Sequence, residues 1–133
     1  MKNNEKDFEI NLIGDRSGEK WLGTFVCNKI LSHRQQLLED QLYQEHLGKG
    51  FTNASPRARE QAEILARIKV SLVKWPDWWK ELGMGMDSVD DNLITEVWTA
   101  IMKIQLAAFE AIQNKAKEAE SQLKEIAASD QLK

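Results

Sequence analysis

Apolar and polar residues alternate near the start of the chain, over residues 8–12, in the order Phe-Glu-Ile-Asn-Leu. A period of two is typical of a strand that buries one face. A second strand is predicted over about residues 20–29, with one face made of Trp21, Gly23, Phe25 and Cys27. Residues 14–18 carry a glycine at each end and predict a turn. The pattern therefore indicates a β-hairpin, and because isolated hairpins are only marginally stable, it must lie on helices or pair with another chain.

The apolar spacing then becomes helical. A first helix is predicted to begin at Ser32, because Gln35 completes a Ser-x-x-Gln capping box. Gly48 is a suitable residue to end it. The residues at helical spacing on this segment are Leu37, Leu38, Gln41, Leu42 and His46. A loop is expected over residues 49–54.

A second helix is predicted from Ser55 and Pro56, since serine is a good N-cap and proline suits the first helical position. Its expected apolar stripe consists of Ala58, Ala62, Ile64, Leu65, Ile68 and Leu72. The residue before Pro76 is biased away from helical geometry. This helix should therefore end at about Lys74.

Residues 76–82 predict a short helical turn that carries two tryptophans, and residues 83–86 (Gly-Met-Gly-Met) predict a break. Ser88 and Asp91 have the spacing of a second capping box. The acidic residues Asp87 and Asp90 suit the positive end of a helix dipole.

The final predicted helix, residues 90–126, is too long for a compact domain. It would span roughly 55 Å, whereas a globule of this size is about 36 Å across. The helix must bend back or project. Bulky residues dominate up to Ile112, and Ala, Glu, Lys and Gln follow. Four later positions have spacings of three and four that suit coiled-coil packing: Ala116, Ala119, Leu123 and Ile126.

These elements predict an α+β fold that is mostly α, with an N-terminal β-hairpin packed on three helices and a long, projecting last helix. We expect residues 1–6 to be disordered, residues 7–112 to form a single α+β domain, and residues 113–133 to form a helical arm. The arm is either a solvated helix or an amphipathic strip for self-association or helix-in-groove binding.

Composition is that of an ordinary folded protein, with 133 residues, 42% hydrophobic and 29% charged. A net charge of −3 with interspersed signs gives no reason to expect a nucleic-acid partner. Cys27 is the only cysteine, which excludes an internal disulfide, suits a reducing compartment and predicts a buried thiol. The first residues lack the apolar segment of a signal peptide, and no apolar run approaches ~18 residues, so we expect a cytosolic protein without a membrane partner.

No pattern indicates catalysis, a cofactor or a metal. His33 and His46 have no metal-ligand spacing around them, and we expect them at the two ends of the first helix, where His46 as a cation would favour the dipole. The cluster of Asp87, Asp90 and Asp91 lacks the regular oxygen ligands of a calcium loop, so helix capping is favoured. The sequence therefore predicts a protein that is not an enzyme.

The five tryptophans are unevenly placed, and three of them lie at Trp75, Trp78 and Trp79. One interpretation is that Trp75 and Trp79 pack beneath the helices while Trp78 is partly exposed. The other is a docking patch, because tryptophan is enriched at binding hot spots. The candidate partner-binding residues are Trp21, Trp75, Trp78, Trp79, Leu123 and Ile126.

The order of elements resembles that of the tail assembly chaperones of long-tailed bacteriophages. The matching segments are residues 8–14 and 21–25 in the hairpin, residues 75–79 (Trp-Pro-Asp-Trp-Trp), and residues 90–94 at the start of the last helix. The resemblance covers about residues 7–112. It implies a non-enzymatic protein in the host cytoplasm that coats the tape measure protein, keeps that long helix soluble and recruits tail-tube subunits. It also implies a homo-oligomer.

Two other functions remain open. The first is a permanent virion component, such as a capsid, neck or tail protein, that uses the hairpin to extend a neighbour's sheet. The second is a small inhibitor or adaptor directed at the host.

Overall fold

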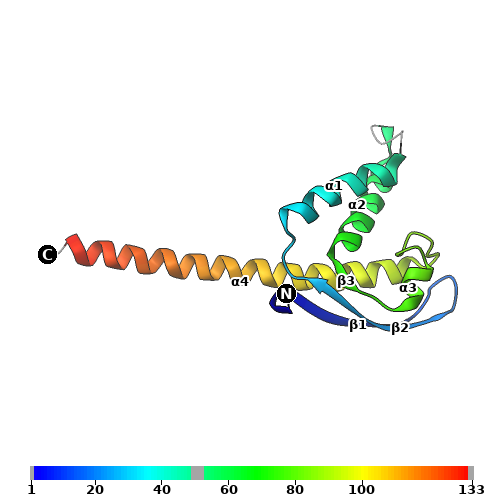
Figure 1. Cartoon of the computed structure of the whole chain (residues 1–133), viewed down its shortest axis with the longest axis horizontal. Coiled ribbons are helices and arrows are strands. Elements are labelled where there is room, and N and C mark those ends of the chain that lie inside the picture. Colours follow the sequence, from blue (N-terminus) through cyan, green and yellow to red (C-terminus); the bar gives the residue numbers. More distant parts are fainter. Residues whose placement is uncertain (1, 49–52, 132–133) are drawn as a thin grey trace.

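The structure is a computed structural model that describes residues 2–48 and 53–131. A three-stranded antiparallel sheet, in the order β1-β2-β3, lies on one side of a long helix, and a pair of shorter helices lies on the other side (Figure 1). The elements are, in chain order, η1 Lys2–Asn4, β1 Glu5–Ile13, β2 Lys20–Asn28, α1 His33–Leu47, α2 Pro56–Ser71, β3 Leu72–Lys74, α3 Asp77–Glu81 and α4 Asp91–Gln131. The predicted class, mostly helical α+β with a long projecting last helix, is confirmed.

The predicted hairpin forms. Phe8 lies opposite Phe25 and Ile10 opposite Gly23, so the apolar side chains of both strands share the face toward the helices. The rings of Phe8 and Phe25 stack with centroids 5.2 Å apart. The sheet is therefore amphipathic, as its alternation indicated.

The expectation that residues 1–6 are disordered is wrong for residues 2–6. Lys2–Asn4 form a 3-10 turn, and β1 already begins at Glu5. The Asn4 side chain explains this order, because its Oδ1 accepts from the Ile30 backbone N–H and its Nδ2 donates to the Ile30 carbonyl. Met1 lies outside the described residues.

The chain also contains a third strand that we did not predict. Helix α2 ends at Ser71, three residues before the expected end, and Leu72–Lys74 form β3 beside β2. The open edge of β2 offers backbone hydrogen bonds, and these outweigh a weak helical preference over three residues. The resulting strand ties the end of α2 to the sheet.

Helix α1 begins and ends where the sequence signals predicted, but several of its apolar residues are exposed. Ser32 and Gln35 form the reciprocal capping box, and Gly48 ends the helix with a φ of 65°. However, Leu37 is 74% exposed, and Leu38 and Gln41 are also exposed. Helix α1 rests on α2 through a small cluster around Leu42, Ala66 and Val70, so of the residues at helical spacing on α1, Leu37, Leu38 and Gln41 do not face α2. Most of the predicted 49–54 loop lies outside the described residues.

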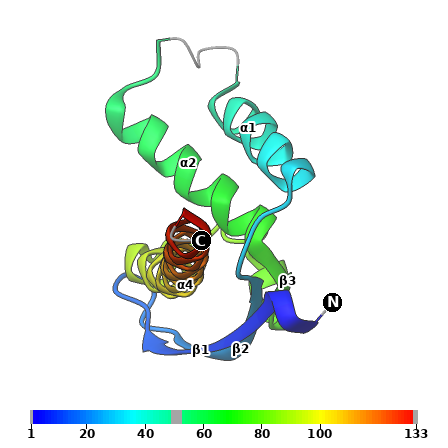
Figure 2. The same ribbon diagram turned by 90° about the vertical axis from the view of Figure 1, so that its left-hand side faces the viewer.

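Helix α4 passes between the sheet and the α1–α2 pair and then projects beyond them (Figure 1). Its residues Leu93, Val97 and Ile101 are fully buried in the main core with Phe25 and Trp79. The helix has 41 residues and is about 60 Å long. Every described side chain from residue 109 to residue 129 is exposed, and we call residues 109–131 the arm. We call the rest of the described chain, which precedes the arm, the body. Figure 2 looks along α4 and shows the sheet and α2 on either side of the helix.

Candidate functional site

Asp90 joins the start of α4 to the turn of the hairpin. It is only 1% exposed, and its two carboxylate oxygens accept four hydrogen bonds from that turn and the strand after it. One oxygen accepts from the backbone N–H groups of Arg16 and Ser17, each at 2.8 Å. The other accepts from the Ser17 hydroxyl at 2.6 Å and from the Trp21 indole at 2.8 Å. We call this arrangement the Asp90 clasp.

The clasp is charged as well as buried. The Ser17 hydroxyl, followed by the backbone and indole N–H donors, holds the pKa of Asp90 well below its usual range, and these donors outweigh burial, which raises it. Gly14 is needed beside it, because a Cβ there would overlap the Asp90 carboxylate. The second predicted capping box does not form as expected, since α4 begins only at Asp91 and the Ser88 hydroxyl accepts from the Asp90 backbone N–H.

An aromatic cluster lies next to the clasp and includes three of the candidate tryptophans. The Trp78 ring contacts Trp21 with centroids 4.9 Å apart and Phe25 at 5.7 Å, and its indole N–H donates to the Leu22 carbonyl. Trp79 is fully buried and meets Phe25 edge to face at 5.4 Å. Both rings therefore contribute mainly to the core that fixes the hairpin on α4.

The tryptophans divide differently from our expectation. Trp79 is buried as one interpretation predicted, but Trp75 is 37% exposed rather than packed beneath the helices. A fully buried Trp79 cannot contact a partner, so its assignment as a partner-binding residue is wrong for this conformation. Trp21 and Trp78 are half-buried and already hydrogen-bonded. Trp75 remains the most accessible of the four candidate tryptophans.

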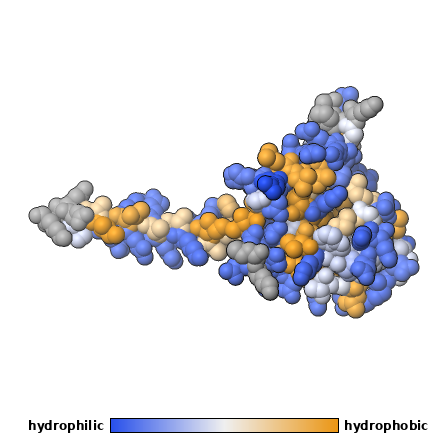
Figure 3. Space-filling view, viewed as in Figure 1, coloured by the Kyte–Doolittle hydropathy of each residue, from blue (hydrophilic) through white to orange (hydrophobic). Residues whose placement is uncertain are grey.

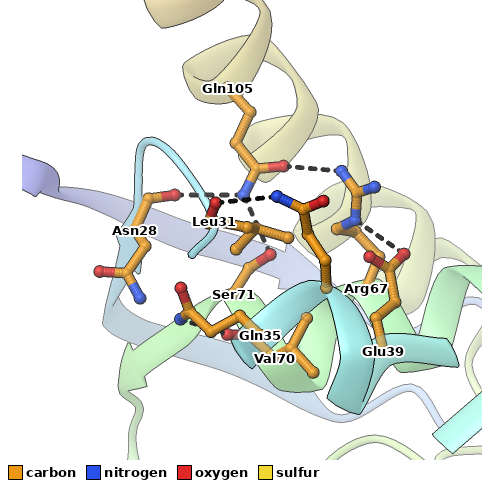
Figure 4. A network of polar contacts seen from close by, with 9 residues as sticks. Asn28, Leu31, Gln35, Glu39, Arg67, Val70, Ser71 and Gln105 are labelled. Atoms are coloured by element: carbon orange, nitrogen blue, oxygen red, sulfur yellow. Dashed lines mark hydrogen bonds and ion pairs between the residues drawn. The ribbon is translucent and has the colours of Figure 1, made fainter. Parts of the chain in front are cut away.

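A polar network fixes the point at which α4 leaves the body (Figure 4). The buried Gln105 side chain donates to the Asn28 carbonyl at 3.1 Å and to the Ser71 hydroxyl at 3.0 Å. Its oxygen accepts from Arg67 at 3.3 Å, and Arg67 also pairs with Glu39 at 2.8 Å. One glutamine of α4 thus contacts β2 and α2 directly, and α1 through Arg67. The sequence analysis did not single out these residues.

Apolar residues follow one side of the arm (Figure 3). The candidate residues Leu123 and Ile126 are 67% and 59% exposed. With four preceding residues they form what we call the arm stripe: Phe109, Ile112, Ala116, Ala119, Leu123 and Ile126. At about 100° per residue, the stripe lies on the same side of α4 as the buried Ile101 and Gln105. The side of α4 that is buried within the body therefore continues along the arm, where it is exposed.

The stripe begins in a hollow at the corner between the arm and the body. The hollow has a volume of about 490 Å³ and includes Ile30 and Leu31 on the body and Leu106 and Phe109 on α4. Ile30 and Leu106 are both exposed. An apolar corner of this kind extends the surface that a helix lying along the stripe would contact.

The remaining reactive groups are buried or scattered. His33 and His46 lie in the first and last turns of α1, as predicted. Burial lowers the pKa of His46, and the charge of Lys69 lowers it further against the opposing charge of Glu45, which disfavours the cation at this helix end. Within residues 2–48 and 53–131, no group of three or more His, Cys, Asp or Glu side chains is placed to hold a metal ion. In the same residues, no helix is both long and apolar enough to cross a membrane.

Cys27 is fully buried, as predicted, and burial raises the pKa of its thiol to about 11. Because the thiolate is the reactive form, we expect no reaction of the folded chain with Ellman's reagent at pH 8. In guanidinium chloride, one thiol per chain should react. Rapid reaction of the folded protein would contradict the burial of Cys27 on β2.

Comparisons of the chain with protein-family models, with characterised proteins and with solved structures find no match.

Proposed function

We propose that the protein is a non-enzymatic assembly chaperone of a long-tailed phage that acts in the host cytoplasm on the tape measure protein. The observation that carries the proposal is the arm stripe, an apolar face that lies open to solvent on a helix held rigidly by the body. The resemblance of residues 7–112 to tail assembly chaperones supplies the identity of the partner.

The stripe suits a helical partner. Its residues recur at alternating spacings of three and four, the pattern by which one helix packs along another. Lys115 and Glu120 flank the stripe, and Lys117 and Glu118 lie on the far side of the helix, so that charged residues keep the outer side of the arm hydrated. A chaperone of a long apolar helix needs these two properties together.

The alternative is a permanent virion component, and one observation favours it. Strand β1 is an edge strand, since in the described sheet it pairs only with β2, and an open edge can accept a strand from a neighbour. However, β1 carries Glu5, Lys6, Asp7 and Glu9, and charges of this kind discourage edge-to-edge pairing. The chaperone is therefore the better-supported function, and mass spectrometry of purified virions separates the two, because only a structural component stays in the particle.

Co-expression with the tape measure protein of the same phage tests the proposal. We expect the wild-type chain to raise the soluble fraction of the tape measure protein several-fold. Leu123→Glu should abolish this effect, because it places a charge in the stripe. Ser121→Glu, on the opposite side of the same helix, should retain it. The proposal fails if the wild-type chain leaves the solubility of the tape measure protein unchanged.

A further inference from the structure

We propose that two copies of the chain pair through their arm stripes, side by side and antiparallel, about a two-fold axis between Ala116 and Ala119. The partner of each stripe is therefore the stripe of a second copy of the same chain. This pairing follows from the arm and the placement of the body alone, and it does not depend on the proposed function.

The stripe is self-complementary in side-chain size. From either end it presents two bulky residues, then two alanines, then two bulky residues, with spacings of three, four, three, four and three. In the antiparallel pair, Phe109 lies opposite Ile126 of the second copy, and Ile112 lies opposite Leu123. Ala116 lies opposite Ala119, so the helices approach most closely at the axis. Each layer joins an a position to a d position, the usual arrangement in two antiparallel helices.

The flanking residues agree with this register. On one side of the stripe, Glu120 lies nearest Gln113 of the second copy, and on the other side Lys115 lies nearest Gln122. No two like charges face each other across these four positions, and each pair joins a charge to an amide that can hydrogen-bond with it. The charges therefore permit the antiparallel pair.

The body excludes the parallel alternative. A parallel pair would bring Lys115 near Glu120 of the second copy, but exposed ion pairs contribute little. The deciding effect is steric. The stripe continues the face of α4 on which the body itself lies over Val97 and Ile101, so parallel helices would force two bodies into the same space. Antiparallel helices place the bodies at opposite ends.

The corner hollow completes the antiparallel contact. Ile126 of the second copy, opposite Phe109, comes to the edge of the hollow, where Ile30 and Leu31 are available on the body. Leu106 then lies nearest Ala127 of the second copy. The tip of each arm therefore contacts the other copy's body as well as its arm, at two symmetric places.

The contact is short, so the dimer should be reversible. The stripe spans 18 residues, or about 27 Å, which places the interface near the lower end of the ~1,200–2,000 Å² typical of stable complexes. We expect a dissociation constant of the dimer in the micromolar range. In the absence of a partner, the pairing would cover the apolar residues of the stripe. When the tape measure protein is present, its helix would replace the second copy. This exchange rests on the proposed function, whereas the pairing does not.

Light scattering of the full chain over a concentration series tests the pairing. The wild-type mass should rise from 15.3 kDa toward twice that value as the concentration passes from about 1 to about 200 μM. Ala119→Glu, at the centre of the stripe, should remain monomeric throughout. Ala128→Glu is the matched control, because it makes the same change on the opposite side of α4 and should dimerise like the wild type. Equal circular dichroism spectra establish that both variants fold.

A spin label at Ala128→Cys tests the orientation, with the wild-type chain as the control for labelling at the buried Cys27. In the antiparallel pair, residue 128 lies level with residue 107 of the second copy, so the two labels are separated by about 32 Å along the helices. In a parallel pair the labels would lie on the two outer sides at the same level, separated only by the width of two helices, about 20–25 Å. A separation in that range would overturn the proposal. A monomer at every concentration, or equal behaviour of the two glutamate variants, would also overturn it. Neither the light-scattering nor the spin-label experiment contains a tape measure protein. A negative result in either would therefore reject the pairing without rejecting the proposed chaperone function.

Discussion

Replacing Asp90 with asparagine is expected to lower the melting temperature by at least about 10 °C. Asparagine has the size of aspartate but only one acceptor oxygen, so its amide would face donors that now bind a carboxylate. The Trp21 indole, the Ser17 hydroxyl and two backbone N–H groups share that carboxylate. Thermal unfolding followed by circular dichroism at pH 7 measures the loss.

Asp91→Asn is the matched control for the clasp. Asp91 is the next residue along the chain, but its side chain is exposed and pairs with the exposed Arg16 side chain at 3.6 Å. Surface pairs of this kind contribute little, so this variant should melt within about 2 °C of the wild type. Equal losses for the two variants would show that the clasp does not hold the hairpin on α4.

The effect of Asp90 should also depend on pH in one direction. Its pKa is held below the usual range in the folded chain, whereas an unfolded aspartate titrates near ~3.9. The stability that the carboxylate contributes is therefore complete above about pH 5 and is lost as the pH falls below about 4. The difference in melting temperature between the wild type and Asp90→Asn should be constant from about pH 5 to 8 and should shrink below about pH 4.

Trp79→Ala is expected to reduce the free energy of unfolding by about 3–5 kcal/mol. The ring is fully buried against Phe25 and lies so close to Gly85 that a Cβ on that glycine would be 2.7 Å from it. Removing it leaves a cavity between the sheet and α4 that the surrounding backbone cannot fill by a small shift. Denaturation in guanidinium chloride, with an unchanged slope, measures the loss.

Trp75→Ala provides the comparison, since Trp75 is three residues from Trp78 in sequence but exposed at the surface. We expect it to cost less than about 1 kcal/mol. Trp78→Ala should fall between the two, because Trp78 is half-buried and its indole binds the Leu22 carbonyl. If all three variants lost the same free energy, the division of the cluster into a buried and an exposed part would be refuted.

Local signals in the sequence were sufficient for the starts of α1 and α2 and for the hairpin. The capping box at Ser32 and the Ser55-Pro56 pair define starting points within a few residues, and this information needs no tertiary context. The strand β3 was missed for the opposite reason. Three residues carry almost no pattern of their own, and their conformation depends on the edge of β2, some 45 residues earlier in the chain.

The candidate site was predictable in the same uneven way. The spacing of Leu123 and Ile126 identified exposed members of the arm stripe directly. The two features that position the arm could not be found, because Asp90 and Arg16 are separated by 74 residues and Gln105 and Asn28 by 77. An aspartate near a helix start suggests a cap, and a glutamine in a helix suggests the surface. Only the folded chain brings their partners to them.

Helix α4 has no glycine or proline from Asp91 to Gln131, and this continuity makes the arm a spacer of fixed length. Flexible linkers give a distribution of end-to-end distances, whereas a continuous helix extends by about 1.5 Å for every residue. The separation between the body and anything bound at the tip of the arm is therefore set by a residue count. Removing one heptad would shorten that separation by about 10 Å while leaving the same side of the helix facing its partner.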